Sequence, residues 1–582
     1  MPDAPHTTPP SDEDGRAQRT DPRRIVVVGG VAGGMSFAAR ARRLDESAAI
    51  TVLERGDHVS FANCGLPYHV SGEIEDEASL LVQTPQSLRA ALNITVHVGH
   101  EVVAIDPDRR TVTASTAHGE AEFSYDDLVL APGAAALRPD IPGVDLPQVQ
   151  TLRTVAEATR LRAVVDAVGD GRRAVVLGGG FIGVEVAEAL RMRGIDVELV
   201  QSGPHVLSPL DAELAHLVQA ELRGAGIRVR THCTATRIDP AAQGVVVHLT
   251  DGDAVPADVV VVASGVTPQS QLAQQAGATL ENGAILVDGF GRTSVPRIWA
   301  VGDAVAHPDP LGGRSRVVPL AGPANRDGRL LADAMLGDGQ VVARPRPIAV
   351  GTAIVRVCGF TAALTGASRR ALDAAGTAYE TIHLHANDHA GYFPGATPIH
   401  LVVHFAAASS PAPGRILGAQ AVGAAGVDKR IDVIATAMRA GLGIGDLIDL
   451  DLCYAPPYGS AKDPVTMAGL VGQNVLDGVT RHWQAWELDE VRRAALILDV
   501  RRPDEWERGH LPGALLVPHT EVRARLDEIR AAAKGRPIRV HCASGVRSYL
   551  AHRILTAAGL DSATLSGGMQ TLLALHGDGI LE

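Results

Sequence analysis

The stretch RIVVVGGVAGG, residues 24–34, decides the fold of this chain. Its apolar, β-branched run predicts a buried parallel strand, and the small residues that follow lead into a helix that we expect to reach about Leu44. A second strand is predicted at residues 50–53 and ends at Glu54, 25 residues after Gly29. In such a unit, amides at the positive end of the helix approach a pyrophosphate, and the acid accepts hydrogen bonds from an adenosine ribose. Any tight turn could use these glycines, but strand, helix and terminal acid together predict a dinucleotide site.

The same pattern occurs a second time. A predicted strand over residues 174–177 leads into GGGFIG at residues 178–183, then a helix and another strand. Two such units predict two dinucleotide sites. The acid expected at the end of the last strand is replaced by Gln201 and Ser202. Without that carboxylate a 2′-phosphate is not strongly repelled, and no nearby arginine clearly attracts one, so NADH and NADPH both remain possible.

Two further apolar strands end in glycine turns, LVLAPG at residues 128–133 and IWAVGD at residues 298–303. They belong with the dinucleotide units because parallel strands of such sheets place their carboxyl ends beside the bound cofactor. The predicted cofactor-binding residues are Gly29, Gly30, Val31, Ala32, Gly33, Gly34, Glu54, Arg55, Ala131, Pro132, Gly133, Gly178, Gly180, Gly183, Gly302 and Asp303.

Cys64 lies shortly after the first unit, in SFANCGLPY at residues 60–68. A flavin enzyme that makes an internal disulfide commonly carries C-x4-C, but here the position five residues on is His69. A lone thiolate can instead form a mixed disulfide with an external thiol, or be oxidised to a sulfenic acid. A buried structural cysteine is the alternative, but this setting predicts a strained turn. A thiolate that faces a flavin is expected to have a lowered pKa.

A second cysteine, Cys542, follows a predicted strand at residues 538–541, and ASGVRS at residues 543–548 leads into a helix. Amides curled around the sulfur, with Arg547 closing the loop, would stabilise a thiolate or persulfide. Cysteine phosphatases use a similar cradle, but their C-x5-R loop is one residue longer than this C-x4-R loop. The shorter loop favours sulfur over phosphate.

Ser36, Arg40 and Arg43 share one face of the helix that follows the first glycine loop. Such a stripe is usually a solvated surface. Here the same unit leads back to the Cys64 turn, where Ser60 and Asn63 could also meet a ligand, and a multiply phosphorylated substrate would suit that face.

Composition excludes several classes of protein. The net charge of −13 argues against a nucleic-acid binder. Five scattered cysteines make a secreted disulfide framework unlikely and fit a reducing cytoplasm. Residues 1–23 lack the apolar segment of a signal peptide and are predicted to form a disordered tail. No run of 18 apolar residues occurs, so no membrane span is predicted, and no metal site is predicted either.

Taken together, these features resemble coenzyme A-disulfide reductases fused to a rhodanese domain, within the pyridine nucleotide-disulfide oxidoreductases. The resemblance covers about residues 24–582. Besides SFANCGLPY, its motifs in the reductase part are PLAGPANR at 319–326, HAGYFPG at 389–395, YAPPY at 454–458 and KDP at 462–464. Its rhodanese motifs are DVR at 499–501, GHLPGA at 509–514 and the Cys542 loop.

The resemblance implies an α/β protein with two Rossmann-like dinucleotide-binding domains, an α+β dimerisation domain and a C-terminal α/β rhodanese domain. The expected boundaries are 24–155 with 285–345 for the FAD-binding domain, 156–284 for the NAD(P)H-binding domain, 346–468 for the dimerisation domain, 469–484 for a linker and 485–582 for the rhodanese domain.

The resemblance also implies residue roles. Cys64 is the redox nucleophile that forms a mixed disulfide with CoA, and Cys542 with Arg547 forms the sulfur-transfer site. Tyr392 and Tyr454 match paired tyrosines that reach the flavin–cysteine centre from the partner subunit of a homodimer, and Tyr454 is also an implied cofactor-binding residue. The implied substrate-contacting residues are Ser36, Arg40, Arg43, Ser60, Asn63, Asn325 and Lys462.

The predicted function is an FAD-dependent reductase that uses NADH or NADPH to reduce CoA disulfide, CoA persulfide or polysulfide. The fused domain is predicted to supply or accept sulfane sulfur. Two alternatives remain at this point: an NADH oxidase or peroxidase that forms a sulfenic acid on its single cysteine, and a sulfur-carrier or persulfide-sensing protein.

Overall fold

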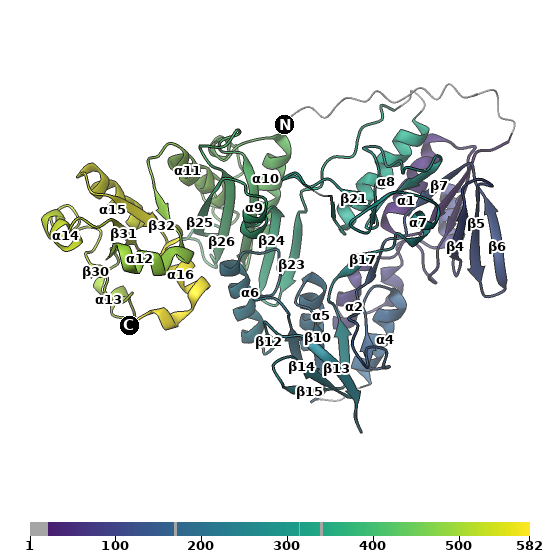
Figure 1. Ribbon diagram of the computed structural model, residues 1–582, viewed down its shortest axis with the longest axis horizontal. Coiled ribbons are helices and arrows are strands. Elements are labelled where there is room, and N and C mark those ends of the chain that lie inside the picture. Colours follow the sequence, from purple (N-terminus) through teal and green to yellow (C-terminus); the bar gives the residue numbers. More distant parts are fainter. Residues whose placement is uncertain (1–20, 168–170, 314, 338–340) are drawn as a thin grey trace.

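The computed structural model describes residues 21–167, 171–313, 315–337 and 341–582. The predicted disordered tail therefore lies outside the described residues, except for 21–23. Figure 1 shows four domains, with the two nucleotide-type domains at one end, a sheet domain in the middle and the C-terminal domain at the other end.

The first domain is a parallel sheet in the order β20-β7-β1-β2-β3. Its strands are β1 (Arg24–Val28), β2 (Ala49–Leu53), β3 (Thr95–His97), β7 (Asp127–Leu130) and β20 (Ile298–Ala300). Both faces of β1 are buried, which explains its continuous apolar run. α1 (Ala32–Leu44) ends where predicted and packs along α8 (Ala321–Leu336). A Cβ at Gly328 would overlap the Gly33 carbonyl, so glycine permits this close helix contact. A separate antiparallel sheet contains β4 (Glu101–Asp106), β5 (Thr111–Thr116) and β6 (Gly119–Ser124).

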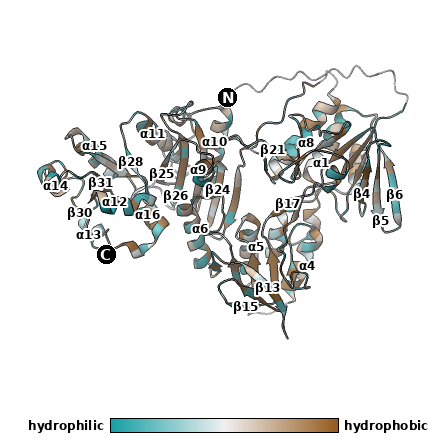
Figure 2. Cartoon of the chain, in the orientation of Figure 1, coloured by the Kyte–Doolittle hydropathy of each residue, from teal (hydrophilic) through white to brown (hydrophobic). Residues whose placement is uncertain are grey.

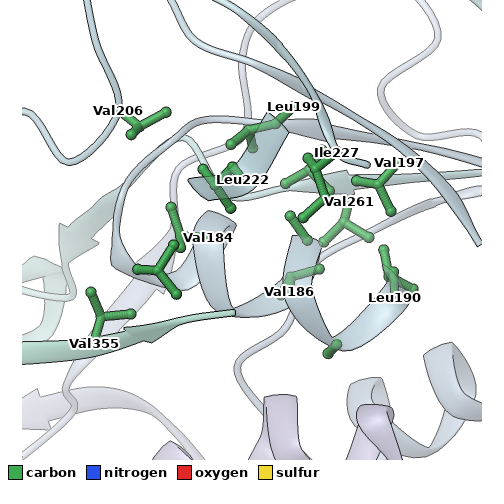
Figure 3. Packing of buried hydrophobic residues seen from close by; sticks show 14 of the residues in the cluster. Val184, Val186, Leu190, Val197, Leu199, Val206, Leu222, Ile227, Val261 and Val355 are labelled. Carbon is green, nitrogen blue, oxygen red and sulfur yellow. The ribbon is translucent and has the colours of Figure 1, made fainter. Parts of the chain in front are cut away.

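The second domain repeats this architecture in the order β12-β11-β10-β16-β9. Its strands are β9 (Val149–Gln150), β10 (Arg173–Leu177), β11 (Asp196–Val200), β12 (Arg228–Arg230) and β16 (Val259–Val262). Figure 3 shows the core, where Val184, Val186 and Leu190 of α5 (Phe181–Met192) pack against side chains of the sheet. The predicted boundary at residue 156 is too late, because β9 already pairs with β16.

The third domain is an antiparallel sheet in the order β23-β24-β27-β26-β25, so β25 lies at an edge. Its strands are β23 (Ala353–Val357), β24 (Phe360–Gly366), β25 (Tyr379–Asn387), β26 (Pro398–Ala406) and β27 (Ile416–Gly423), and α10 (Val427–Ala440) contacts β24 and β27. The predicted linker at 469–484 is largely wrong. Residues 469–476 continue α11 (Pro464–Leu476), because apolar side chains such as Ala468 and Val471 pack into the core of this domain.

The C-terminal domain is a parallel sheet in the order β28-β32-β31-β29-β30. Its strands are β28 (His482–Trp483), β29 (Leu496–Asp499), β30 (Leu515–Leu516), β31 (Ile538–His541) and β32 (Ser562–Leu565). Because β28 pairs with β32, the domain begins before residue 485 and the connection shortens to residues 477–481. Helices α15 (Val546–Ala557) and α16 (Gly568–His576) follow the last two central strands, and Figure 2 shows hydrophilic residues on the outer helix α14 (Leu526–Ala533).

Across the part of the chain that the structure describes, no helix is both long enough and apolar enough to cross a bilayer.

Candidate active sites

The first glycine loop joins β1 to the start of α1. Gly29 has φ +99°, and a Cβ there would overlap the Ala131 carbonyl, so glycine is required for the loop to approach the next strand. Glu54 is buried, and its carboxylate accepts hydrogen bonds from the amides of Gly30 (2.7 Å) and Gly56 (2.8 Å). The carboxylate therefore lies against the first glycine loop.

These residues fit FAD. The amides at the start of α1 suit a pyrophosphate, and Glu54 suits an adenosine ribose. Gly133 and Gly302 both have positive φ, so the turns after β7 and β20 leave backbone open at the same edge of the sheet. Asp303 lies 3.6 Å from the Arg153 guanidinium, and burial raises the pKa of its carboxyl. Arg55 donates to Gln269 Oε1 at 2.8 Å.

Cys64 lies in a short turn, η1 (Asn63–Gly65), that continues into α2 (Leu66–Ser71). Ser60, at the start of this segment, has φ +51°, a left-handed conformation that costs a non-glycine residue about 1 kcal/mol. Its amide donates to the Gly30 carbonyl at 2.7 Å, and its carbonyl accepts from the Val82 amide at 3.1 Å. The predicted strained turn is therefore present, and it is braced against the first glycine loop.

The expected lowering of the Cys64 pKa is not supplied by the protein's own groups. Cys64 is open to a pocket, yet burial of the sulfur raises its pKa, and the negative charges of Glu185 and Asp303 add to this. Arg153 acts in the opposite direction but does not outweigh them. The helix that follows has only six residues, so its dipole offers little compensation.

Glu185, which the sequence reasoning missed, is electrostatically the nearest acid to Cys64. Burial and the charge of Glu188 raise its pKa to about 7, although a hydrogen bond from Tyr68 opposes the shift. The charge of this carboxyl is one of the causes that raise the pKa of the Cys64 thiol. Its only sequence signal is its position, two residues after the second glycine loop.

A cavity of about 800 Å³ opens beside Cys64. Its walls are the outer face of α1, the Cys64 turn, α3 (Pro85–Leu92) and the start of α8. The structure brings six of the seven predicted substrate-contacting residues together here: Ser36, Arg40, Arg43, Ser60, Asn63 and Asn325. Within the pocket, Ser36 Oγ donates to Asn325 Oδ1 at 2.6 Å, and Asn63 Nδ2 donates to the Arg153 carbonyl at 2.8 Å.

The three pocket arginines are not equivalent. Arg40 Nε donates to Asp333 Oδ1 at 2.6 Å, so much of its charge is already neutralised. Arg329, four residues after Asn325 on α8, also lines the cavity and was not predicted. Among the described residues, neither Arg43 nor Arg329 forms an ion pair, and both are exposed. These two guanidiniums are therefore the free positive charges of the pocket.

Three predicted residues do not line this pocket. The hydroxyls of Tyr392 and Tyr454 lie 3.1 Å apart, but both side chains are exposed on the third domain, 75% and 49% respectively. Lys462 is exposed on the same domain. A single chain therefore does not bring these residues to Cys64.

The second glycine loop is built like the first, with Gly178 at φ +112°. Gln201 is buried and accepts a hydrogen bond from the Gly179 amide at 2.8 Å, as Glu54 does from Gly30. Arg230 is on the adjacent strand, but Glu198, Asp251 and Asp253 all pair with it. The site thus fits a nicotinamide dinucleotide, with a neutral side chain where an acid would repel a 2′-phosphate.

The Cys542 loop connects β31 to α15. The sulfur is buried and accepts a hydrogen bond from the Gly545 amide at 3.2 Å. Arg547 is held by two hydrogen bonds of 2.6 and 2.7 Å to Glu505, which also lower the pKa of that carboxyl to about 2. Glu505, on α13 (Pro503–Trp506), was missed because nothing in the loop itself points to it.

Three family models match successive parts of the chain. Residues 23–328 match the model described as pyridine nucleotide-disulphide oxidoreductase, and residues 352–464 match the dimerisation domain of the same family. The chain belongs to the pyridine nucleotide-disulphide oxidoreductase family. Residues 483–574 match the rhodanese-like domain. The predicted fold class is confirmed, and this oxidoreductase is of the FAD-dependent type that binds a nicotinamide nucleotide.

Several named proteins are similar to this oxidoreductase. The coenzyme A disulfide reductase of Staphylococcus haemolyticus is 33% identical over 450 residues, which is 77% of this chain and 98% of that protein. The reduced CoADR-RHD of Bacillus anthracis is 39% identical, with a TM-score of 0.92, and covers 97% of this chain and 100% of its own. An NAD-dependent persulfide reductase from A. fulgidus is 37% identical, with a TM-score of 0.86, and covers 94% of this chain and 99% of its own.

Proposed function

We propose that this protein is an NAD(P)H-dependent reductase of CoA disulfide and of CoA persulfide or polysulfide. The observation that carries the proposal is the pocket, which has one thiol, Cys64, beside the guanidiniums of Arg43 and Arg329, neither of which forms an ion pair with another described residue. A phosphorylated thiol or disulfide satisfies both features at once. The relatives named as coenzyme A disulfide reductase and persulfide reductase support the same substrate class.

The proposed chemistry begins at Cys64. Its thiolate attacks one sulfur of a CoA disulfide, the sulfur–sulfur bond breaks, one CoA leaves as a thiolate that takes up a proton, and a mixed disulfide joins Cys64 to the second CoA. The first glycine loop and Glu54 would hold FAD, which would supply the two electrons, taken from NAD(P)H, that return this mixed disulfide to CoA thiol and Cys64 thiolate. Arg43 and Arg329 hold the phosphates, and Ser36 and Asn325 orient the arm that carries the sulfur.

The active form in this proposal is a homodimer. The match to the family's dimerisation domain supports it, as does the exposed tyrosine pair on that domain. Tyr392, Tyr454 and Lys462 of one subunit would then complete the Cys64 pocket of the other.

The five cysteines form no disulfide, which supports the proposed cytoplasmic location.

The test is NADH and NADPH oxidation by the purified flavoprotein with CoA disulfide, CoA persulfide, polysulfide and oxygen alone. Rapid oxidation with the CoA substrates supports the proposal. Oxidation with oxygen alone at a comparable rate would identify an oxidase, which also needs only one cysteine. No oxidation with any substrate would leave a sulfur carrier or persulfide sensor.

The double variant Arg43→Ala with Arg329→Ala is expected to raise KM for CoA disulfide roughly 20-fold, because each exposed charge contributes about 1 kcal/mol to phosphate binding. KM for a small uncharged disulfide should stay within about twofold, since no phosphate is lost. Steady-state kinetics with both substrates measures the difference. Arg40 is left intact because its removal would strand Asp333, which is nearly buried. Equal effects on both substrates would assign the two arginines to a solvated surface.

Gln201→Glu is expected to raise KM for NADPH on the order of tenfold, because a carboxylate beside the glycine loop repels a 2′-phosphate. KM for NADH should change little, since the new carboxylate can still accept from the Gly179 amide. Gln201→Met is the matched control, which loses that hydrogen bond without adding charge and should affect both nucleotides alike. An unchanged NADPH preference in Gln201→Glu would place the 2′ position elsewhere.

A further inference from the structure

The C-terminal domain docks on the exposed edge of the third domain's sheet. An edge strand leaves unpaired backbone groups that must be covered. On β25, the Thr381 carbonyl accepts from Gln484 Nε2 at 2.9 Å, and the His383 amide donates to Ser566 Oγ at 3.0 Å. Side chains of the C-terminal domain therefore satisfy this edge. Figure 1 shows β25 as the strand that faces the C-terminal domain.

Two histidines of β25 continue the contact. His383 is buried, with Nδ1 2.9 Å from Ser566 Oγ and Nε2 2.9 Å from Glu213 of α6 (Ala212–Gly224). His385 Nε2 lies 2.8 Å from Thr571 Oγ1 on α16. Each histidine thus touches one side chain of the C-terminal domain, and His383 also links it to the second domain. None of these contacts belongs to either active site described above.

The docked turn is also the turn that holds the Cys542 loop. Gly567 has φ +72°, and a Cβ there would come within 2.7 Å of the His383 Cβ. Gly568 has φ +65°, and a Cβ there would come within 2.7 Å of the Cys542 carbonyl. Gly567, which lies against His383, is therefore adjacent to Gly568, which lies against the Cys542 loop, and neither position has room for a side chain.

The start of α16 fixes the loop by hydrogen bonds. The Met569 amide donates to the Cys542 carbonyl at 2.8 Å, and the Gln570 amide donates to the Ala543 carbonyl at 3.0 Å. These are the otherwise unpaired amides of a helix N-terminus, so loop and helix move together. Farther along α16, the Ala574 carbonyl contacts His216 Nδ1 of α6 at 2.9 Å. The helix is therefore anchored to the body of the protein at both ends of its contact surface.

We propose that His383 and His385 are positioning residues for the Cys542 loop, so that docking of the C-terminal domain on β25 and α6 sets the loop geometry for sulfur transfer. The proposal rests on the proposed function only in taking Cys542 as a sulfur acceptor. A misplacement of about 1 Å at a reacting atom is enough to lower a rate on the order of 100-fold. Because the start of α16 is hydrogen-bonded to the Cys542 loop, undocking of α16 would displace the loop by such an amount.

The dock also contains a pair of neutral histidines. His385 Nδ1 lies 2.7 Å from His400 Nδ1, and this pair can hold only one proton between the two atoms. Burial, with His400 and His383 nearby, holds the pKa of His385 well below its usual range, and burial also lowers the pKa of His400. The other titratable or charged groups around the dock are Asp211, Glu213, Arg369, His404 and His482.

Docking of the C-terminal domain should depend on pH. A histidine that stays neutral in the docked state and protonates when released stabilises docking above its free pKa of about 6.5, and this stabilisation is lost as the pH falls below that value. Sulfur transfer by the wild-type chain should therefore decline on the acid side of pH 6.5.

The experiment uses the full chain with two variants, His385→Ala and His385→Gln. In His385→Ala, kcat for sulfur transfer from thiosulfate to cyanide should fall by about tenfold, with KM for thiosulfate within about twofold, because the loop is displaced and not removed. NADH-dependent reduction of CoA disulfide should be unchanged. His385→Gln should restore at least half of the rate, because its amide can still donate to Thr571, and it should lack the acid decline.

The matched control is His552→Gln, a buried histidine of the C-terminal domain whose Nδ1 lies 2.7 Å from Ser562 Oγ and which forms no hydrogen bond with His383 or His385. An equal loss of sulfur transfer in this control, or in CoA-disulfide reduction by His385→Ala, would overturn the proposal. So would a wild-type rate in His385→Ala. If the wild type itself transfers no sulfur, the assignment of Cys542 fails. The effect of docking on the loop is then measured by the rate at which iodoacetamide alkylates Cys542, which should still differ between the wild type and His385→Ala. Equal alkylation rates would overturn the proposal.

Discussion

Cys64→Ser is expected to abolish reduction of CoA disulfide, with a loss on the order of 10⁴-fold, while FAD remains bound. A serine hydroxyl at this position cannot form the mixed disulfide through which the two electrons reach CoA. Among the described residues that line the pocket, Cys64 is the one cysteine, so no neighbour can replace it. Glu54 and the first glycine loop are untouched, so the flavin site should remain intact.

The measurement combines NAD(P)H oxidation with the absorbance of bound flavin. The wild-type protein, isolated without reductant, should also carry a CoA adduct on Cys64 in its mass spectrum. Cys358→Ser is the matched control, because Cys358 is only partly buried and lies outside the pocket. A Cys64→Ser variant that keeps the wild-type rate, in a protein with no CoA adduct, would refute the assignment of the nucleophile.

The parts of this protein that the sequence predicts well are those encoded by local patterns. The strand at residues 24–28 is an apolar run that leads into a glycine turn, and the structure has this strand and the predicted strand at residues 538–541 at those positions. The face of α1 that carries Ser36, Arg40 and Arg43 follows from helical periodicity alone. The nearness of that face to Cys64 followed from the chain returning to the end of the same unit.

The parts that were missed depend on contacts between distant segments. Arg329 reaches the pocket only because α8 packs on α1, and Asp333 neutralises Arg40 through the same packing. Glu505 approaches Arg547 from another element of the domain, 42 residues away in sequence. No period or spacing in the sequence records these pairs.

The surroundings of the Cys64 thiol have the same origin. Burial of the sulfur and then the charge of Glu185, which enters from the second domain, raise the pKa of this thiol, and neither can be read from the turn itself. The pKa of a side chain is shifted by burial and by all charges and hydrogen bonds near it in space, so the local sequence motif supplies only one of several contributions. The misplaced linker is a similar case, because α11 has the small apolar composition of a connector but packs as part of the core.

Cys542→Ser is expected to lower sulfur transfer from thiosulfate or polysulfide on the order of 10⁴-fold and to leave reduction of CoA disulfide nearly unchanged. In the proposed mechanism, the Cys542 thiolate takes the outer sulfur of thiosulfate, sulfite leaves, and a persulfide remains. The Gly545 amide already points at this sulfur, and Arg547, oriented by Glu505, supplies the positive charge that stabilises an anionic product.

The persulfide would then pass its outer sulfur to a CoA thiol, which restores the Cys542 thiol and yields CoA persulfide for reduction at Cys64. Because the two centres share one chain, the local concentration of sulfur donor is raised without a stronger contact. NADH oxidation driven by thiosulfate plus CoA should therefore fall in Cys542→Ser, whereas oxidation driven by CoA disulfide should not. Glu505→Gln keeps the Cys542 sulfur but loses the negative charge of the Arg547–Glu505 pair. Its rate of thiosulfate-driven NADH oxidation should lie between the rates of the wild type and Cys542→Ser. Unchanged rates in both assays would disprove the relay, and a collapse of both would mean that the C-terminal domain serves the fold and not the chemistry.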